Sequence, residues 1–453
     1  MNPFPHQIEG ALFLADRRRA LLADEPRVGK TGAAIMAADY ALAETILVIT
    51  TSSGRPVWRR AFEQWSPFGR TVQVLDGKRP LDQKAQVAIV SWDTIVKPEI
   101  RSALLRRKSH CVIPDEGHKA KNFDAKRTQV LYGELGRGGA DLDNSVALAA
   151  DQDHIWPLTG TPCPNSPFDL YPHLRALEPW RLAARDGMPD VMKAESFMHR
   201  YCVVRMKKTS NFRKIPVVVG GRNAPELRER IKGFWLLRTQ KDVGITEPIY
   251  ETFPLAAQAR LLREVNAIID ETKMGRLRGK KTVTEDDLKA VELELAQIRR
   301  LTGTGKALAV AEAVKDEFDC GLDKIVLAYW HKDVGDLLQH ELSTFGVVRL
   351  DGSTSANMRG EAEQRFLHDP KIRVFLGQIQ AAGEAIDLSS AAELMFVETS
   401  IVPKDMAQMS KRITNHTQAR QPRVRVATLE GSVDDALQAI LLRKWSAIRE
   451  VLS

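Results

Sequence analysis

Short apolar runs alternate with helical patterns between Arg19 and Thr161, and this alternation predicts one α/β lobe. The runs read RALLAD, TILVITT, VAIVSW and HCVIPDE, and the first is followed by KTGAAIMAADYALA at helical spacing. Buried strands interleaved with helices favour a parallel sheet that is covered on both faces.

A second alternating series begins at Lys324, with the runs KIVLAYW, VVRLDG, RVFLGQI, ELMFVET and RVRVATL. It predicts a second lobe of the same class. The chain between the lobes is mostly helical in pattern, and Thr284 with Asp287 resembles a capping box that opens a helix. We therefore expect three parts: a nucleotide-binding lobe at 1–180, helical and basic insertions at 181–300, and a second lobe at 301–453.

Composition narrows the class of protein only a little. The 453 residues are too many for one hydrophobic core, and 43% hydrophobic and 27% charged residues are ordinary values for a globular protein. The net charge of +8 suits a polyanionic partner such as nucleic acid, although basic surfaces also serve solubility.

The four cysteines form no CxxC pair and are irregularly spaced, which argues against a zinc site or a disulfide framework. No apolar run approaches the roughly 18 residues that a membrane span needs, and the first ten residues contain no apolar signal region. We expect a monomer in the cytoplasm of a prokaryote or a virus-infected cell, without membrane association.

The stretch LLADEPRVGKTGAA ends a predicted strand and opens a predicted helix at Gly29, Lys30 and Thr31. Backbone N–H groups in this setting face bound phosphates, while the lysine reaches the terminal phosphates and the threonine holds magnesium. Asp24 stands where the common form of this loop begins with glycine. A helix start with an ordinary surface lysine would show the same three residues, so the rest of the chain must decide.

An acidic pair, Asp115 and Glu116, follows the apolar run HCVIPDE. In an ATP-hydrolysing site the first carboxylate holds magnesium and the second polarises the attacking water. Acidic pairs after apolar runs are often only solvated, but this pair comes after the glycine-lysine loop with the strand TILVITT between them. Pro114 is unusual here, because it removes a ladder donor from a predicted central strand.

In the second lobe, Arg412 lies on a predicted helix after ELMFVET. An arginine supplied in cis can stabilise the charge that develops in phosphoryl transfer. An exposed helix arginine is the alternative. The stretches LTGTPCPN, RLDGST and GEAIDL are separately weak signals.

As a set, these motifs resemble those of the Swi/Snf-type DNA translocases of helicase superfamily two. That family reads ADEMGLGKT where this chain has residues 23–31, so the absent first glycine is usual for it. DEGH with KAKN resembles its Walker B box, LTGTPCPN its third motif, and RLDGST and GEAIDL its second-lobe motifs. The segment from YCVV to LLRTQKDV is similar to the annealing-helicase branch and to compact prokaryotic or viral members.

The resemblance implies two RecA-like lobes with helical insertions, ATP and Mg²⁺ as cofactors, and DNA-stimulated ATP hydrolysis on double-stranded DNA, forked or branched DNA included. The catalytic residues it implies are Lys30, Asp115, Glu116 and Arg412. The magnesium ligands would be Thr31 and Asp115. The nucleotide-binding residues would be Gln7, which reads adenine in the family, with Asp24, Glu25, Gly29, Lys30, Thr31, Gly383, Asp387 and Gln408.

Two groups of residues are expected to contact DNA. Those at the family's DNA-contacting motifs are Thr50, Thr51, Ser52, Trp58 and Ser91. The others belong to the basic stretch KMGRLRGKK and are Lys273, Arg276, Arg278, Lys280 and Lys281. A second basic stretch, 206–214, is a further candidate, and for both stretches a solvated loop is the alternative.

Three residues depart from the family pattern: Arg27 and Ala385 stand where glycine is usual, and Asn415 stands where the last motif has its second arginine. Asn415 removes one of two charges that face the phosphates. The alternatives to a translocase are therefore a fork-regression or annealing motor, and a nucleotide-switched DNA-binding protein with weak ATPase activity.

Overall fold

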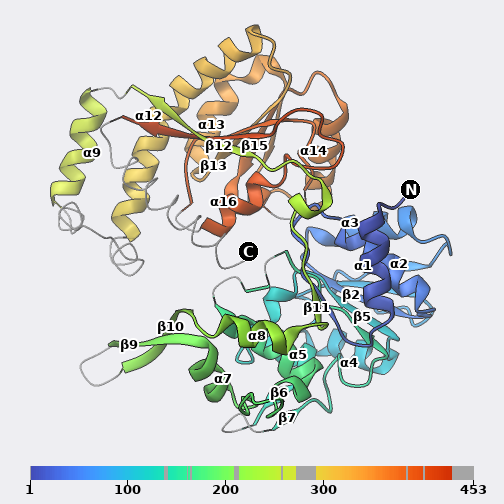
Figure 1. Cartoon of the computed structure of the whole chain (residues 1–453). Helices are drawn as coiled ribbons and strands as arrows, with labels where there is room; N and C mark the ends of the chain where they lie inside the picture. The colour runs from blue at the N-terminus through green and yellow to red at the C-terminus, as the bar shows by residue number, and fades with distance from the viewer. Residues whose placement is uncertain are drawn as a thin grey trace. The chain divides into compact units, whose positions relative to one another are not determined.

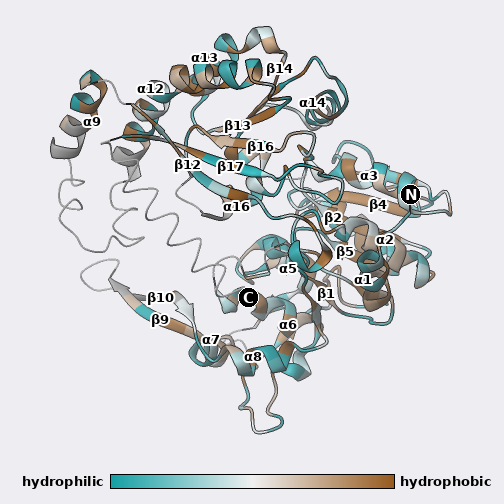
Figure 2. Cartoon of the chain, turned by 45° about the horizontal axis from the view of Figure 1, so that its top comes forward, coloured by the Kyte–Doolittle hydropathy of each residue, from teal (hydrophilic) through white to brown (hydrophobic). Residues whose placement is uncertain are grey.

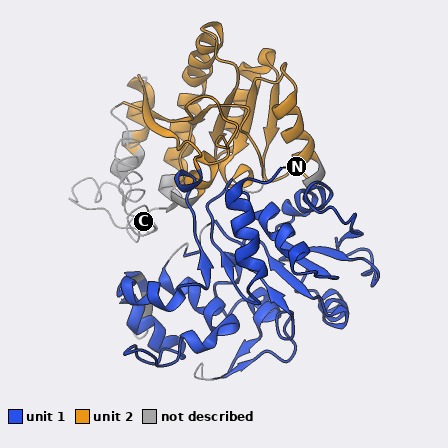
Figure 3. Cartoon of the chain, turned by 45° about the vertical axis from the view of Figure 1, so that its right-hand side comes forward, with its two compact units in different colours: residues 1–243 blue, residues 244–453 orange. Residues whose placement is uncertain are grey.

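The structure is a computed structural model that describes residues 2–136, 141–160, 162–163, 166–208, 214–256, 259–271, 292–383, 386–400 and 403–430. It contains two compact units, residues 1–243 and 244–453 (Figure 3). Each unit is built on its own parallel sheet with helices packed against it (Figure 1). The predicted α/β class with parallel sheets is confirmed.

The sheet of unit 1 has the strand order β3-β4-β2-β5-β8, and all its pairings are parallel. Its strands are β2 (Ile46–Thr50), β3 (Val72–Val74), β4 (Val87–Ser91), β5 (Cys111–Pro114) and β8 (His154–Ile155). The short strand β1 (Leu21–Leu22) pairs in parallel with β11 (Trp235–Leu236). Parallel bridges from Arg19 to Ile155 and from Leu22 to Leu158 place β1 beside β8, so the sheet continues through it.

Apolar residues on both faces of β2 form the core of unit 1. Ile46 and Val48 pack in the cluster that contains residues of α1, α2 and α3, whereas Leu47 and Ile49 pack with residues of α4 to α8. The strands accordingly appear as hydrophobic ribbons between the helices (Figure 2). The α-helices of unit 1 are α1 (Pro5–Ala15), α2 (Lys30–Tyr40), α3 (Gly54–Trp65), α4 (Pro98–Arg107), α5 (Lys126–Tyr132), α6 (Tyr171–Leu177), α7 (Ala194–Tyr201) and α8 (Ala224–Ile231).

Two antiparallel strand pairs form separate small sheets in unit 1. β9 (Cys202–Lys208) and β10 (Lys214–Gly221) form a hairpin beside α7 and α8 (Figure 1), and β6 (Glu134–Leu135) pairs with β7 (Leu142–Asp143). The basic stretch 206–214 falls on the hairpin, and residues 209–213 lie outside the described residues. Short 3-10 helices occur at Gly117–Ala120, Pro167–Leu170, Pro179–Arg181 and Lys241–Val243.

The sheet of unit 2 has the order β12-β17-β16-β13-β15-β14, again with parallel pairings. Five strands match the predicted runs: β13 (Ile325–Tyr329), β14 (Val347–Leu350), β15 (Val374–Gln378), β16 (Glu393–Phe396) and β17 (Arg423–Leu429). The sixth, β12 (Ile249–Leu255), was not predicted as a strand. It is an edge strand, which explains how it tolerates Pro254.

Helices cover both faces of this second sheet as well. Val326 and Ala328 of β13 pack with residues of α14 and α16, whereas Ile325 and Leu327 pack with residues of α12 and α13. The helices are α9 (Ala259–Glu271), α12 (Glu292–Asp319), α13 (Lys332–Glu341), α14 (Ala356–His368), α15 (Ile379–Ala382) and α16 (Pro403–Ser410), with a 3-10 helix at Ser343–Phe345.

The two units divide the predicted middle segment between them, since residues 181–243 belong to unit 1 and residues 244–300 to unit 2. The three-part division itself stays a prediction. The expected capping box at Thr284 and Asp287 lies outside the described residues. In the described part of the chain, no helix has the length and apolar character needed to cross a membrane.

Pro114, unusual in the sequence, is the last residue of β5. Its carbonyl accepts a hydrogen bond from Leu158 N at 2.9 Å, and the next residue, Asp115, donates its N–H to Ile49 O at 2.7 Å. The proline therefore removes a donor only where the strand ends, and the carboxyl end of the strand stays paired on both sides.

Candidate ATP site

The phosphate-loop sequence lies between β1 and α2, at the carboxyl edge of the sheet in unit 1. Gly29 precedes α2 with φ +98°, and a Cβ atom there would lie 2.1 Å from Gln7 Nε2. Only glycine fits this backbone conformation and this contact without strain. Gln7, expected to read adenine, therefore lies directly against the loop.

Lys30 is the first residue of α2, and its side chain turns back into the loop. Its Nζ donates to the carbonyl oxygens of Asp24 at 2.6 Å and Glu25 at 3.1 Å. The ammonium group is thus held at the start of a helix of 11 residues, where backbone N–H groups and the helix dipole favour an anion. Thr31 follows it in the first turn.

Asp115 accepts hydrogen bonds from three side chains that lie far from it in sequence, two at its carboxylate and one at its backbone carbonyl. Thr50 Oγ1 and Trp58 Nε1 both donate to Asp115 Oδ2 at 2.8 Å, and Trp92 Nε1 donates to the Asp115 carbonyl oxygen at 2.8 Å. The carboxylate is therefore fixed by the end of β2 and by α3, and Trp92 in the loop after β4 holds the backbone of the same residue. Lys30 and Asp115 are also close enough to interact electrostatically.

The protonation of Asp115 reflects these neighbours. Burial raises the pKa of Asp115, and the nearby charge of Glu116 raises the pKa further. The hydrogen bonds from Trp58 and Thr50 and the positive charge of Lys30 lower it. Burial and Glu116 outweigh the donors, so the pKa of Asp115 is raised, while Trp58, Thr50 and Lys30 oppose that shift and favour the ionised carboxylate, the form that binds a metal ion.

Glu116 is held in an uncommon backbone conformation, with φ +52°. Its Oε2 lies 3.2 Å from His118 Nδ1, which in turn lies 3.2 Å from Thr159 Oγ1. Gly117 N donates to Leu158 O at 2.7 Å. Glu116 is thus connected through His118 to the LTGTP stretch, of which Thr161 lies outside the described residues.

Most of the expected DNA-contacting side chains near this site are buried. Thr50, Trp58 and Ser91 are 0%, 1% and 2% exposed, and Ser91 Oγ pairs with Thr94 Oγ1 at 2.8 Å. Thr51 Oγ1 accepts from Gly54 N at 3.0 Å, whereas Ser52 is exposed. Contact with DNA stays a prediction for all of them. The observed role of Thr50 and Trp58 is to hold Asp115.

The sequence did not single out the residues that hold Asp24 and Glu25. Arg238 pairs with the buried carboxylate of Asp24 through Nη2–Oδ2 at 2.5 Å and Nε–Oδ1 at 3.0 Å. Arg238 Nη1 also lies 2.9 Å from Glu9 Oε2. Gln240 donates its N–H to Glu25 Oε2 and its Nε2 to the Pro26 carbonyl, both at 2.9 Å.

The carboxylates of Asp24 and Glu25 therefore anchor the loop to the segment after β11. The stretch LLRTQKDV contains the signal that could have revealed this, because an arginine directly after an apolar strand is placed to pair with a carboxylate on the neighbouring strand. Binding of a nucleotide by Asp24 and Glu25 stays a prediction.

Arg27, which departs from the family pattern, has φ +72°. This left-handed conformation suits glycine, the residue that is usual at this position in the family. The loop thus keeps the backbone shape of a glycine position while carrying a long side chain.

In unit 2, Arg412 and the expected nucleotide-binding residues lie close together. Arg412 donates to the Gly383 carbonyl from Nε at 3.1 Å and from Nη2 at 2.5 Å, and its own carbonyl accepts from Leu388 N. Asp387 Oδ1 accepts from Ser389, next to Leu388. Gln408 lies on α16, whereas Arg412 lies in the turn after that helix ends at Ser410, so the predicted placement of Arg412 on a helix is wrong.

Asn415, in place of the second arginine, is built into this same region. Its Nδ2 donates to Ser389 Oγ at 2.5 Å, and its Oδ1 accepts from Thr417 N at 2.9 Å. Ala385 lies outside the described residues, as do the predicted DNA contacts Lys273, Arg276, Arg278, Lys280 and Lys281.

Comparison with known proteins decides the family. A family profile described as SNF2-related domain matches residues 6–246, which is more than half of the chain and includes the whole loop and acid pair. The chain belongs to the SNF2-related family. The resemblance inferred from the motifs is thereby confirmed.

Similar proteins match this SNF2-related chain over nearly its whole length. The SWI/SNF-related matrix-associated actin-dependent regulator of chromatin subfamily A-like protein 1 homolog of Caenorhabditis elegans is 26% identical, over 99% of this chain and 61% of that protein. The Xenopus tropicalis protein of that name is 26% identical, over 98% and 44%. The human DNA annealing helicase and endonuclease ZRANB3 is 24% identical, over 97% and 39%.

The chain thus spans less than two thirds of the length of these relatives. Among solved structures, the Sulfolobus solfataricus SWI2/SNF2 ATPase core in complex with dsDNA aligns with 100% of this chain and 93% of that chain, at 18% identity and a TM-score of 0.44.

The anchoring of the loop by Arg238 leads to the first prediction. Arg238→Met should destabilise unit 1 by about 3–5 kcal/mol, because the buried carboxylate of Asp24 would lose its partner. Arg59→Met is the matched control, since Arg59 pairs with Glu63 on the surface and such pairs contribute about 1 kcal/mol or less. Thermal unfolding followed by circular dichroism measures both variants. Equal losses in the two variants would mean that Arg238 does not anchor the loop.

Proposed function

We propose that this SNF2-related chain is an ATP- and magnesium-dependent motor that acts on double-stranded DNA, with ATPase activity that DNA stimulates. The observation that carries the proposal is the arrangement at the carboxyl edge of unit 1. There Lys30 lies near Asp115, and Asp115 is held by Thr50 and Trp58, which the sequence assigned to DNA-contacting motifs. The hydrogen bonds that orient Asp115, the proposed magnesium ligand, are therefore made by two residues that are also proposed to contact DNA.

The residues at this edge fit ATP with magnesium. Gly29, Lys30 and Thr31 would hold the phosphates, and Thr31 with Asp115 would hold the ion. Among the described residues no group of three His, Cys, Asp or Glu side chains could bind a metal by itself. In nucleotide sites Mg²⁺ takes one or two protein ligands and completes its octahedron with phosphate oxygens and water, so Thr31 and Asp115 would suffice to hold it.

Each protein group has a separate task in turnover. ATP held with magnesium by Lys30, Thr31 and Asp115 would supply the phosphoryl group for transfer to water. Glu116 accepts the proton of that water on its carboxylate, and His118 at 3.2 Å keeps the carboxylate in place. Thr50 and Trp58 keep Asp115 oriented, so that the protein need not reorganise around a new charge.

Family membership and the net charge of +8 support DNA as the polyanionic partner. The similar proteins of Homo sapiens and Mus musculus are named DNA annealing helicase and endonuclease ZRANB3, so a fork-regression or annealing motor is a second form of the same proposal. The monomeric state and the cytoplasmic setting stay predictions from the sequence.

Asn415 favours one further alternative, a DNA-binding protein that ATP switches but that hydrolyses ATP poorly. The Asn415 side chain forms hydrogen bonds with Ser389 and Thr417, so the neighbouring residues fit a neutral amide at this position. In the proposed motor, Asn415 leaves Arg412 as the remaining positive charge of the last motif that faces the phosphates.

The site in unit 1 leads to a prediction for two of its residues. Lys30→Ala should abolish phosphate release while duplex binding at low salt remains, because the phosphates and the DNA are held by different groups. Glu116→Gln should still bind ATP but not hydrolyse it, since an amide accepts no proton. Lys84→Ala, at an exposed lysine of the same unit, is the control. Parent-like, DNA-stimulated phosphate release by folded Lys30→Ala protein would exclude the proposed ATP site.

Residues of unit 2 separate the motor from the switch. Arg412→Ala should lower the rate of turnover by about 10³–10⁵, the contribution of an arginine to phosphoryl transfer, while Arg420→Ala should not. Asn415→Arg should raise turnover, less so if the loss of its contacts with Ser389 and Thr417 disturbs the loop. Single-turnover phosphate release with duplex DNA measures all three variants. Background turnover in the parent that Asn415→Arg restores would favour the switch.

A further inference from the structure

A second cationic site lies at the opposite edge of unit 1 from the phosphate loop. Arg17, Arg18 and Arg19 come directly before β1, and Gly233 comes just before β11. Because β1 runs parallel to β11 and to β8, these residues lie where the strands begin. The phosphate loop follows the same strand at its other end. The two sites are therefore separated by the length of the sheet.

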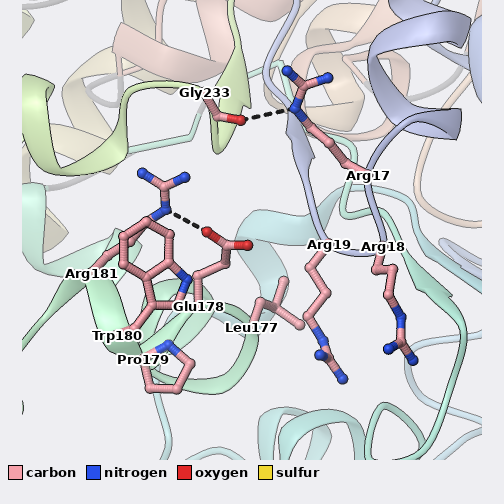
Figure 4. Close-up of a pocket in the computed structure, with 9 residues that line it drawn as sticks. All are labelled: Arg17, Arg18, Arg19, Leu177, Glu178, Pro179, Trp180, Arg181 and Gly233. Atoms are coloured by element: carbon pink, nitrogen blue, oxygen red, sulfur yellow. Dashed lines mark hydrogen bonds and ion pairs between the residues drawn. The ribbon is translucent and has the colours of Figure 1, made fainter.

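These residues line a cavity of about 450 Å³, within the range of small-molecule sites. Figure 4 shows Trp180 and Pro179 on one side of it and Arg18 and Arg19 on the other. Leu177 adds to the apolar part of the lining. One wall of the cavity is thus aromatic and apolar and also contains the Glu178–Arg181 ion pair, and the other wall is cationic.

The arginines of this cavity differ in how they are paired. Arg17 is satisfied, since it donates to the Gly233 and Phe13 carbonyls at 3.1 Å and 3.0 Å. Arg18 is exposed and lies 3.9 Å from Asp153, which is also exposed. Arg19 has no hydrogen bond or ion pair with any residue that the structure describes, and its Nε is buried. Seven other arginines of the described chain also have a buried Nε that donates no hydrogen bond, so what sets Arg19 apart is that its guanidinium lines a cavity in which an anion could bind.

The aromatic wall is held rigidly yet remains open. Trp180 is 53% exposed, with the guanidinium groups of Arg181 and Arg185 at 4.5 Å and 4.9 Å from its ring centroid. Arg181 is itself fixed by Glu178 at 2.5 Å and by the carbonyls of Arg230 and Lys232. The positive charge of Arg181 is therefore paired within the protein, and the Trp180 indole is held in position without a ligand.

We propose that this cavity binds a nucleotide unit of single-stranded DNA, with a base against Trp180 and a phosphate at Arg19. A flat ring beside an unpaired guanidinium matches the two parts of a nucleotide, and stacking on an aromatic side chain tolerates any base. An acidic peptide would satisfy Arg19 but would leave Trp180 without a flat partner. The inference rests on the proposed action on DNA, because a motor at forked or annealing DNA meets single strands.

The test measures binding of the full chain to a short, labelled oligothymidylate by fluorescence anisotropy. Trp180→Ala and Arg19→Gln should each weaken binding about tenfold, which is within the effect of losing one stacked base. Trp180→Phe, which keeps an aromatic ring, should retain most of the affinity. Arg19→Gln should also lower the log–log salt slope by about 0.7, the value for one phosphate contact on a single strand.

Arg106→Gln is the matched control. Arg106 is an exposed arginine near the end of α4, just before β5, so its loss removes the same charge from the same edge of the sheet. It should leave oligothymidylate binding unchanged. Duplex-stimulated phosphate release should be unaffected in every variant, which separates this site from the ATP site.

Two results would overturn the inference. One is parent-like oligothymidylate binding by both Trp180→Ala and Arg19→Gln. The other concerns Arg19→Gln alone. In that result, the variant no longer binds free thymidine monophosphate or polyglutamate but binds oligothymidylate as the parent does. If the parent lacks duplex-stimulated ATPase activity but the variants weaken strand binding, the proposed function fails and this site stands.

Discussion

The arrangement of unit 1 depends on the carboxylate of Asp115 and its two donors, Thr50 Oγ1 and Trp58 Nε1, both at 2.8 Å. These hydrogen bonds join the ends of β2 and β5 to α3, and they orient a charged group that burial would otherwise disfavour. Because Lys30 lies within electrostatic range, the phosphate loop is part of the same network. A shift at the end of β2 or in α3 would therefore move the proposed magnesium ligand.

A second constraint fixes the loop from the other side. Arg238 and Gln240 bind Asp24, Glu25 and the Pro26 carbonyl, and they lie just before the boundary between the two compact units. The chain that leaves unit 1 is thus attached to the proposed phosphate-binding loop. The loop and the connecting chain are thus joined by a buried ion pair as well as by the covalent chain.

The sequence predicted much of the fold, because buried parallel strands are nearly continuous apolar runs between helices and turns. It missed β12, most of whose residues are exposed or half-buried and which contains Pro254. It also assigned Thr50 and Trp58 by motif, although their bonds to Asp115 depend on pairing between β2 and β5, which spacing does not reveal. The partner of Asp24 lies 214 residues away, and the cavity at Arg19 contains no motif at all. Contacts between residues that are far apart in the sequence can be identified only from the folded structure.

The most direct test of this account is the magnesium dependence of duplex-stimulated phosphate release in a Thr50→Val, Trp58→Phe double variant. The change removes both donors to Asp115 Oδ2 and keeps a side chain of similar kind at each position. A hydrogen bond to a charged group contributes about 1.5–3 kcal/mol, so the half-maximal magnesium concentration should rise about tenfold or more. Trp156→Phe is the control, because its buried indole donates to Arg17 O instead. The same magnesium curve in the double variant, the control and the parent would contradict the account.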